Sequence, residues 1–196
     1  MKRSKPGAQQ QVRIIGGKWK GQKVRFTGDS TLRPTLGRIR ETLFNWIRPE
    51  LSGARVLDLF AGSGALGLEA LSQGAAQAIF VERNRRTSTA LRSTLNTLDA
   101  DPAAKVLCQD ALRFLKGAEE PFDIIFVDPP YAQEPLLRQT LTLLSKRRLA
   151  AGPVYAEFKD EAVLRQAAEQ AGFAITKTSR AGDSTAALLE LNRRDA

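Results

Sequence analysis

Four acidic residues stand at or just beyond the ends of short apolar stretches, and this repeated placement is the first sign of chemistry in the chain. Asp58, Glu82, Asp110 and Asp128 each close such a stretch. If the stretches are parallel strands, their carboxyl ends meet at one edge, where open α/β sheets bind ligands. Glu82 could accept both hydroxyls of a ribose, and Asp110 the amino group of an adenine. The alternative, that the acids cap the following helices, explains one or two of them but hardly all four.

A glycine-rich turn follows the first acid, within the sequence RVLDLFAGSGALG of residues 55–67. Gly62, Gly64 and Gly67 satisfy the G-x-G-x-x-G pattern of dinucleotide sites, which is weak evidence alone. A pyrophosphate prefers a helix N-terminus without negative charge nearby, whereas Asp58 stands just before this turn. Asp58 suits the ammonium of an amino acid better. A ligand with adenosine at one end and an amino acid at the other is S-adenosylmethionine.

The segment DLFAGSGALG resembles the first motif of class I methyltransferases. The resemblance implies that Asp58 and Gly62 contact the methionine end of S-adenosylmethionine, Glu82 the ribose and Asp110 the adenine. The expected cofactor site also includes their neighbours Phe60, Ala61, Ser63, Gly64, Arg83 and Ala111.

Asp128-Pro129-Pro130-Tyr131 is similar to the motif of enzymes that methylate exocyclic or amide nitrogens. Such an amine is a poor nucleophile because its lone pair is delocalised. The Asp128 carboxylate and the Pro129 carbonyl can accept its N–H groups and let the nitrogen become pyramidal. The prolines stiffen this backbone, and Tyr131 can stack on the base. No strong base is required. Carbon methylation of a pyrimidine normally needs a cysteine, but the single cysteine, Cys108, is expected to lie in the core of a strand.

Strands and helices must alternate to bring these residues together. The periodicity predicts a basic hairpin over 11–15 and 18–26 and a helix over 35–47. Beyond them it predicts strands over 55–60, 78–82, 105–109, 122–127, 153–158, 173–179 and 184–192, and helices over 65–71, 85–98, 111–116, 135–148 and 161–171. This order is typical of an α/β, Rossmann-like fold with a mostly parallel seven-stranded sheet and helices on both faces. The last two strands are expected to form an antiparallel hairpin at Gly182.

The positive charge is concentrated in the first quarter of the chain. Residues 1–53 contain 12 Lys and Arg against three acids, and the other residues contain 18 of each sign. This asymmetry indicates a face that binds a polyanion; the alternative is a solvated basic tail. Cations that alternate with an aromatic residue suit RNA, although Trp19 could equally pack the hairpin onto the domain. The predicted RNA-binding residues are Arg13, Lys18, Trp19, Lys20, Lys23, Arg25, Arg33, Arg38 and Arg40.

Composition excludes several classes of protein. One cysteine and no histidine exclude a disulfide framework and make zinc sites and histidine-based triads untenable. No apolar run approaches a membrane span, and the basic start lacks the apolar segment of a secretory signal. We therefore expect a cytoplasmic protein without a bound metal and without a membrane partner. We also expect a monomer.

The combination of RIIGGKWKG at residues 13–21, LRPT at 32–35, RETLFN at 40–45, the glycine turn and DPPY resembles the bacterial small-subunit ribosomal RNA (guanine-N2)-methyltransferases of the RsmD type. The resemblance covers about residues 12–192. It implies methyl transfer to N2 of one guanine in 16S ribosomal RNA, with an assembled small subunit as substrate. The family usually has an aspartate where this chain has Gly37, so a contact of that aspartate would be missing here.

The sequence predicts three parts of the chain: a disordered basic tail over 1–11, an RNA-binding extension over 12–53 and a methyltransferase domain over 54–196.

Two other functions compete with methylation of guanine N2 in ribosomal RNA. A methyltransferase of the same fold could act on DNA adenine N6 or a protein glutamine, since these substrates share the DPPY motif. A non-catalytic RNA-binding assembly factor could keep the fold, but it would have no use for Asp58, Glu82 and the DPPY motif together.

Overall fold

The computed structural model describes residues 9–27, 35–130 and 133–192 of the 196-residue chain. Its strands are β1 (Gln9–Arg13), β2 (Lys23–Thr27), β3 (Arg55–Asp58), β4 (Gln77–Val81), β5 (Ala104–Leu107), β6 (Ile124–Val127), β7 (Val154–Phe158), β8 (Phe173–Ala181) and β9 (Ser184–Leu191). Its helices are η1 (Gly17–Trp19), α1 (Thr35–Trp46), α2 (Arg48–Leu51), α3 (Ala65–Ser72), α4 (Arg85–Thr97), η2 (Asp101–Ala103), α5 (Ala111–Gly117), α6 (Glu134–Lys146) and α7 (Glu161–Gln170).

Seven strands form one sheet in the order β5-β4-β3-β6-β7-β9-β8. The pairs from β5 to β7 are parallel, and β9 runs antiparallel to both of its neighbours. The central strands β6 and β7 are buried along their whole length, as parallel strands covered on both faces must be. The predicted Rossmann-like fold is therefore confirmed, together with the closing antiparallel pair.

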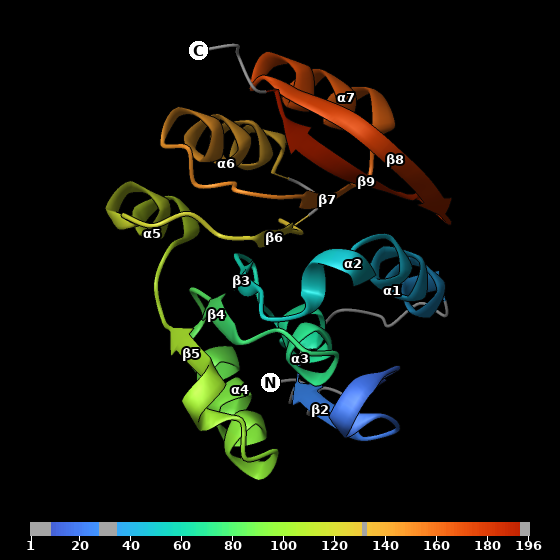
Figure 1. Cartoon of the computed structure of the whole chain (residues 1–196), viewed down its shortest axis with the longest axis vertical. Helices are drawn as coiled ribbons and strands as arrows, with labels where there is room; N and C mark the ends of the chain where they lie inside the picture. Colours follow the sequence, from blue (N-terminus) through green and yellow to red (C-terminus); the bar gives the residue numbers. More distant parts are fainter. Residues whose placement is uncertain (1–8, 28–34, 131–132, 193–196) are drawn as a thin grey trace, which may run out of the picture.

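Helices cover both faces of this sheet (Figure 1). Helices α5, α6 and α7 lie on one face, over an apolar cluster that includes Leu115, Leu141 and Leu164. Helices α1, α3 and α4 lie on the other face, over a cluster that includes Leu43, Leu68 and Leu91. Because Leu43 of α1 shares this cluster with Phe126 of β6, the predicted extension packs into the same core as the sheet.

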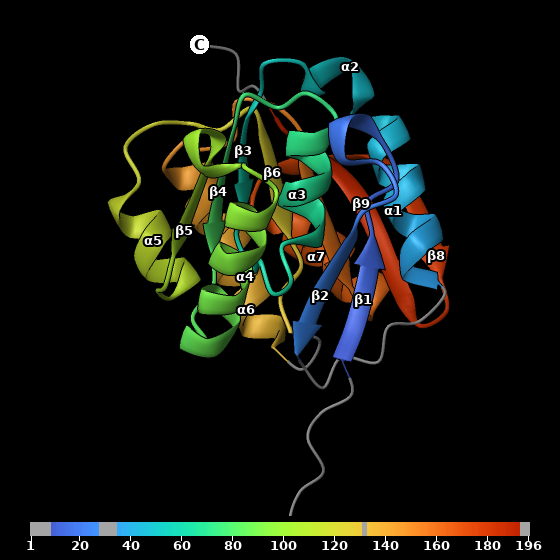
Figure 2. The ribbon, with the colours of Figure 1, turned by 90° about the horizontal axis from the view of Figure 1, so that it is seen from below.

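The β1–β2 hairpin lies outside the sheet, beside α3 and α4 (Figure 2). Its two strands are antiparallel, with Val12 opposite Val24. The predicted hairpin is thus present, but two of its boundaries differ. Strand β1 begins at Gln9, inside the segment expected to be disordered, and residues 17–19 form the short helix η1 instead of continuing the second strand.

Helix α1 has the expected apolar stripe, since Ile39 and Leu43 are buried, but it ends at Trp46, one residue before the buried Ile47. Gly37 lies in its first turn, where an added Cβ would meet no atom within 4 Å. An aspartate at this position would fit the space available, so no packing constraint among the described neighbours explains the glycine.

Candidate functional site

The turn between β3 and α3 uses its glycines for two different physical reasons. Gly62 and Gly64 have φ values of +51° and +75°, which residues with a Cβ rarely adopt. A Cβ on Gly64 would lie 2.4 Å from Leu91 Cδ1, and one on Gly67 2.3 Å from Phe80 Cε1, so these two glycines permit close packing. A Cβ on Gly62 would approach only the Phe60 carbonyl, at 3.9 Å. Gly62 is therefore the glycine at which a ligand can come close to the backbone.

Asp58, the last residue of β3, accepts a hydrogen bond from the first turn of α3, as an N-cap side chain would. Gly64 occupies the N-cap position of α3 and has no side chain to accept a hydrogen bond. Asp58 Oδ2 instead accepts from the Gly67 amide at 3.0 Å. The side chain is buried, and burial raises its pKa to about 7; the Gly67 hydrogen bond opposes this rise, and the charge of Glu82 adds to it. A buried carboxylate of this kind gains most from a cationic ligand.

Replacing Asp58 by asparagine is expected to change how stability depends on pH. The folded pKa of about 7 exceeds the unfolded value, so the stability contributed by protonation of Asp58 is fully present below about pH 4 and is lost as the pH rises to about 7. The asparagine side chain can still accept from Gly67 but does not titrate. We expect urea unfolding to show native stability falling by a few kcal/mol across this window, and a smaller fall in the variant, in which Asp128 still titrates. Equal pH slopes in both proteins would contradict the burial of a charge here.

Glu82, just beyond β4, ties the glycine turn to the next strand. Its Oε2 accepts from the Gly62 amide at 3.0 Å, and its Oε1 accepts from the Asn84 amide at 2.6 Å. The Gly62 amide is therefore already bound by the Glu82 carboxylate and is not free to donate to a phosphate. This contact argues against a pyrophosphate at the turn, in agreement with the rejection of a dinucleotide site.

Asp110 is exposed and caps α5, accepting from the Arg113 amide at 3.0 Å. The capping alternative thus applies to this acid, although its carboxylate retains further acceptor capacity. The remaining predicted cofactor residues follow the same ends of β3, β4 and β5. Arg83 is exposed, Phe60 and Ser63 are half-buried, and Ala61 and Ala111 are buried.

Asp128 follows β6, the parallel neighbour of β3, so it joins Asp58 and Glu82 at one edge of the sheet. Burial raises its pKa well above the ordinary value, and the charges of Glu157 and Asp58 raise it further. Pro129 is buried and Pro130 exposed, and the Pro130 carbonyl accepts from the Gln133 amide at 3.0 Å. The last residue of the motif, Tyr131, lies outside the described residues.

Glu157 is a buried acid that the sequence analysis missed. Val127 and Ala156 are register partners on the parallel strands β6 and β7, so Asp128 and Glu157 are the next pair along. Glu157 accepts from the Tyr155 hydroxyl at 2.7 Å and from the Ser184 hydroxyl at 2.6 Å. The available signal was an acid inside the apolar strand 154–158, although sequence alone did not show which strand would lie beside Asp128.

Two of the predicted RNA-binding residues are buried, and these predictions are wrong. Trp19 is 7% exposed and packs in the apolar cluster with Ile14 and Leu68, so its ring is not free to stack on a base. Arg40 is also 7% exposed; it donates to the Arg13 carbonyl and lies 3.8 Å from the Glu69 carboxylate. Both side chains hold the hairpin and α1 against α3.

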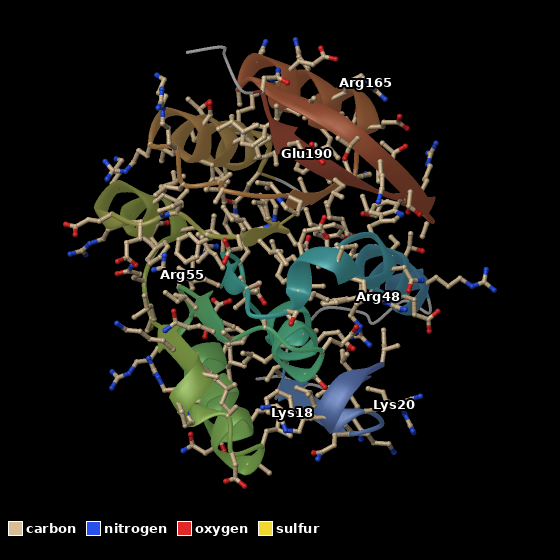
Figure 3. The ribbon with its side chains drawn as sticks, in the orientation of Figure 1. Lys18, Lys20, Arg48, Arg55, Arg165 and Glu190 are labelled. Carbon is tan, nitrogen blue, oxygen red and sulfur yellow. The ribbon has the colours of Figure 1, made fainter. Side chains whose placement is uncertain are left out.

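The exposed cations of the hairpin are Arg13, Lys18, Lys20 and Lys23. Lys18 and Lys20 project from the hairpin at one end of the molecule (Figure 3), and the Lys18 ammonium lies 4.1 Å from the Trp19 ring centroid. Arg38 is exposed on α1. The side chain of Arg25 and the whole of Arg33 lie outside what the structure describes. Four hairpin cations thus remain available to an anionic partner.

Cys108 is exposed, so the prediction that it belongs to the core is wrong. Strand β5 ends at Leu107 and is the edge strand of the sheet, which leaves the next residue uncovered.

Within residues 9–27, 35–130 and 133–192, no cluster of three or more potential metal ligands occurs. The helices in these same ranges include none long and apolar enough to cross a membrane.

Comparisons with known proteins identify the family and the fold of this chain. The family model described as Conserved hypothetical protein 95 matches residues 12–190. Ribosomal RNA small subunit methyltransferase D of Escherichia coli K12 is 47% identical over 144 residues, which cover 74% of this chain and 72% of that protein. The solved structure of yhhF from Escherichia coli has a TM-score of 0.80 and 41% identity, covering 92% of this chain and 97% of that chain. Magnesium protoporphyrin IX methyltransferase from Synechocystis PCC 6803, solved with bound SAM, has a TM-score of 0.63, covers 83% of this chain and 85% of that chain, and at 17% identity shares the fold.

Proposed function

Because this chain belongs to the Conserved hypothetical protein 95 family, which includes ribosomal RNA small subunit methyltransferase D, we propose that it methylates the exocyclic N2 of one guanine in 16S ribosomal RNA with S-adenosylmethionine as methyl donor. The observation that carries the proposal is the placement of Asp58, Glu82 and Asp128 at the carboxyl ends of three adjacent strands, around the glycine turn. We further propose that the substrate is an assembled or assembling small subunit and that the enzyme acts as a cytoplasmic monomer.

The residues around the turn fit this cofactor. The buried Asp58 suits a cationic amino acid end, and Glu82 has acceptor capacity beyond its two backbone contacts for the ribose hydroxyls. Gly62 leaves room for a ligand against the backbone. When bound, the cofactor supplies a methyl group on a cationic sulfur.

Asp128 is assigned the chemical step. Its carboxylate accepts an N–H of the guanine amine, orients the nitrogen toward the methyl donor and stabilises the positive charge that develops on it. The Pro129 carbonyl is proposed to accept the second N–H, and Tyr131 to stack on the flipped base. The proton that the amine loses passes to Asp128 or to water.

Glu82→Ala is expected to weaken binding of S-adenosylmethionine by about 1.5–3 kcal/mol, because two hydrogen bonds to a charged acceptor disappear. Glu82→Gln is the matched control, since its amide oxygen keeps one acceptor for the Gly62 amide. Isothermal titration calorimetry with the cofactor measures both. Unchanged affinity in the alanine variant, or tight binding of NAD by the native chain, would refute the assignment.

Mass spectrometry of the product nucleoside tests the reaction itself. The native chain is incubated with labelled cofactor and small subunits from cells that lack this methylation, and separately with naked 16S RNA. N2-methylguanosine is the expected product. A methyl group on adenine N6, on a protein glutamine or on a cytosine carbon would support another enzyme of this fold, and absence of transfer would favour an assembly factor.

A further inference from the structure

Helix α3 contacts the proposed cofactor site at its N-terminal end and the basic hairpin at its C-terminal end. Its first turn follows the glycine turn, where Gly64 occupies the N-cap position and the Gly67 amide donates to Asp58. Its last turn carries Glu69 and Ser72, which face the hairpin. Figure 2 shows the hairpin lying beside α3.

Glu69 is fully buried and binds the start of the hairpin loop through its backbone. Its Oε2 accepts from the Ile15 amide at 2.8 Å, and its Oε1 accepts from the Gly16 amide at 2.8 Å. The Gln73 side chain donates to Oε1 at 2.7 Å, and Arg40 Nε lies 3.8 Å from Oε2. The two consecutive amides of Ile15 and Gly16 thus donate to a buried carboxylate on a helix, and not to the carbonyls of a neighbouring strand.

Ser72, one turn after Glu69 on α3, makes further contacts with the loop, and Gly17 of the loop lies against it. The Ser72 hydroxyl accepts from the Trp19 amide at 3.0 Å and donates to the Gly16 carbonyl. Gly17 comes so close to the end of α3 that an added Cβ would lie 1.6 Å from the Ser72 carbonyl oxygen. The loop is therefore seated directly on the helix backbone, and a side chain at position 17 would force it away.

We propose that Glu69 and Ser72 are positioning residues for RNA: by binding the backbone of Ile15, Gly16 and Trp19 they hold the basic hairpin at a set distance from the methyl donor, without touching either ligand. The inference deepens the proposed function, on which it rests. Neither residue was predicted from the sequence. Holding the cations Arg13, Lys18, Lys20 and Lys23 on a preorganised frame reduces the entropy lost when RNA binds.

The loop offers a matched pair of glycines for the test. Gly17 and Gly21 both have positive φ, +74° and +85°, so alanine strains the backbone at either position. A Cβ on Gly21 meets nothing within 4 Å, whereas one on Gly17 collides with α3. Gly17→Ala and Gly21→Ala therefore share the local strain and differ in whether the loop can stay on the helix. Ser72→Ala is a milder third variant that removes the contact to Trp19.

We expect Gly17→Ala to raise KM for unmethylated small subunits by about tenfold or more, since several buried donors lose their acceptors. Its kcat at saturating RNA and its Kd for S-adenosylmethionine should stay within about twofold of native. Hydrogen exchange should show lost protection at the amides of Ile15, Gly16 and Trp19 but not at Gly67. Ser72→Ala should shift KM in the same direction by less, and Gly21→Ala should keep the native KM and amide protection.

Three results would overturn the inference. Full protection of the loop amides in Gly17→Ala would show that α3 does not hold them. Lost protection with an unchanged KM would show that the docked hairpin does not position RNA. A fall in cofactor affinity equal to the rise in KM would show a general structural role. If the native chain transfers no methyl group to RNA, the proposed function fails and the positioning role fails with it, whereas the exchange data still report whether Glu69 and Ser72 hold the loop.

Discussion

Replacing Asp128 by alanine is expected to lower kcat by about 10²–10³-fold, the effect of removing one preorganised charged group from a transition state. The reason is that the amine becomes cationic as the methyl arrives, and Asp128 is the acidic member of the motif. Cofactor affinity should change little, because the partner of Asp128 is the substrate amine. Single-turnover methylation of small subunits measures the chemical step, and calorimetry measures the cofactor.

Asp128→Asn is the control that separates charge from shape. Burial together with Glu157 and Asp58 raises the pKa of Asp128 well above its ordinary value, so the carboxylate is protonated and unable to act as a charged acceptor at low pH. We expect native kcat/KM to rise with pH across this raised pKa. The asparagine side chain keeps an acceptor oxygen but does not titrate, so the smaller activity of this variant should keep only the rise that comes from Asp58, whose pKa is raised to about 7. An alanine variant with near-native turnover would remove Asp128 from the mechanism.

Reversing the four exposed hairpin cations is expected to abolish RNA binding at physiological salt. The substitutions are Arg13→Glu, Lys18→Glu, Lys20→Glu and Lys23→Glu, all on the hairpin outside the sheet. Each phosphate that a cation neutralises releases counterions, so the native protein should lose affinity steeply as salt rises. If all four meet phosphates, removing them should make the slope of log K against log salt shallower by about 3.

A second quadruple variant has the same net charge as the hairpin variant and serves as its control. It replaces four exposed cations outside the hairpin by glutamate, one each on β5, α5, α6 and α7: Lys105, Lys116, Lys146 and Arg165. Arg165 lies at the opposite end of the molecule from Lys18 and Lys20 (Figure 3). Fluorescence anisotropy with labelled 16S RNA fragments compares the two. Equal losses in both variants would mean that overall charge, and not the hairpin, attracts RNA; native binding by the hairpin variant would refute its role directly.

Much of the secondary structure could be predicted from the sequence because it is encoded locally. Alternating apolar stretches, glycines and helix caps placed each strand and each α-helix from β3 to β9 to within a few residues of its observed bounds. The short helices were not foreseen, because a single turn leaves no periodic pattern to detect.

The site acids illustrate both the success and the limit of local patterns. An acid beyond a parallel strand must lie at the carboxyl edge, so Asp58, Glu82 and Asp128 could be predicted to meet there. Which strands become neighbours depends on long-range pairing. Glu157 therefore could not be placed beside Asp128 until β7 was known to pair with β6.

The sequence by itself determined that the first quarter is basic and that acids and glycines meet at one edge of an α/β sheet, since charge and periodicity are properties of neighbouring residues. Only the tertiary structure decided which basic and aromatic residues face solvent. Trp19 and Arg40 resemble their exposed neighbours in the sequence, yet both are buried, because α3 supplies partners that are distant in the chain: Ser72 for the Trp19 amide and Glu69 for the Arg40 guanidinium. The physical reason is that burial is decided by contacts between segments that are distant in the chain, and no local pattern carries that information.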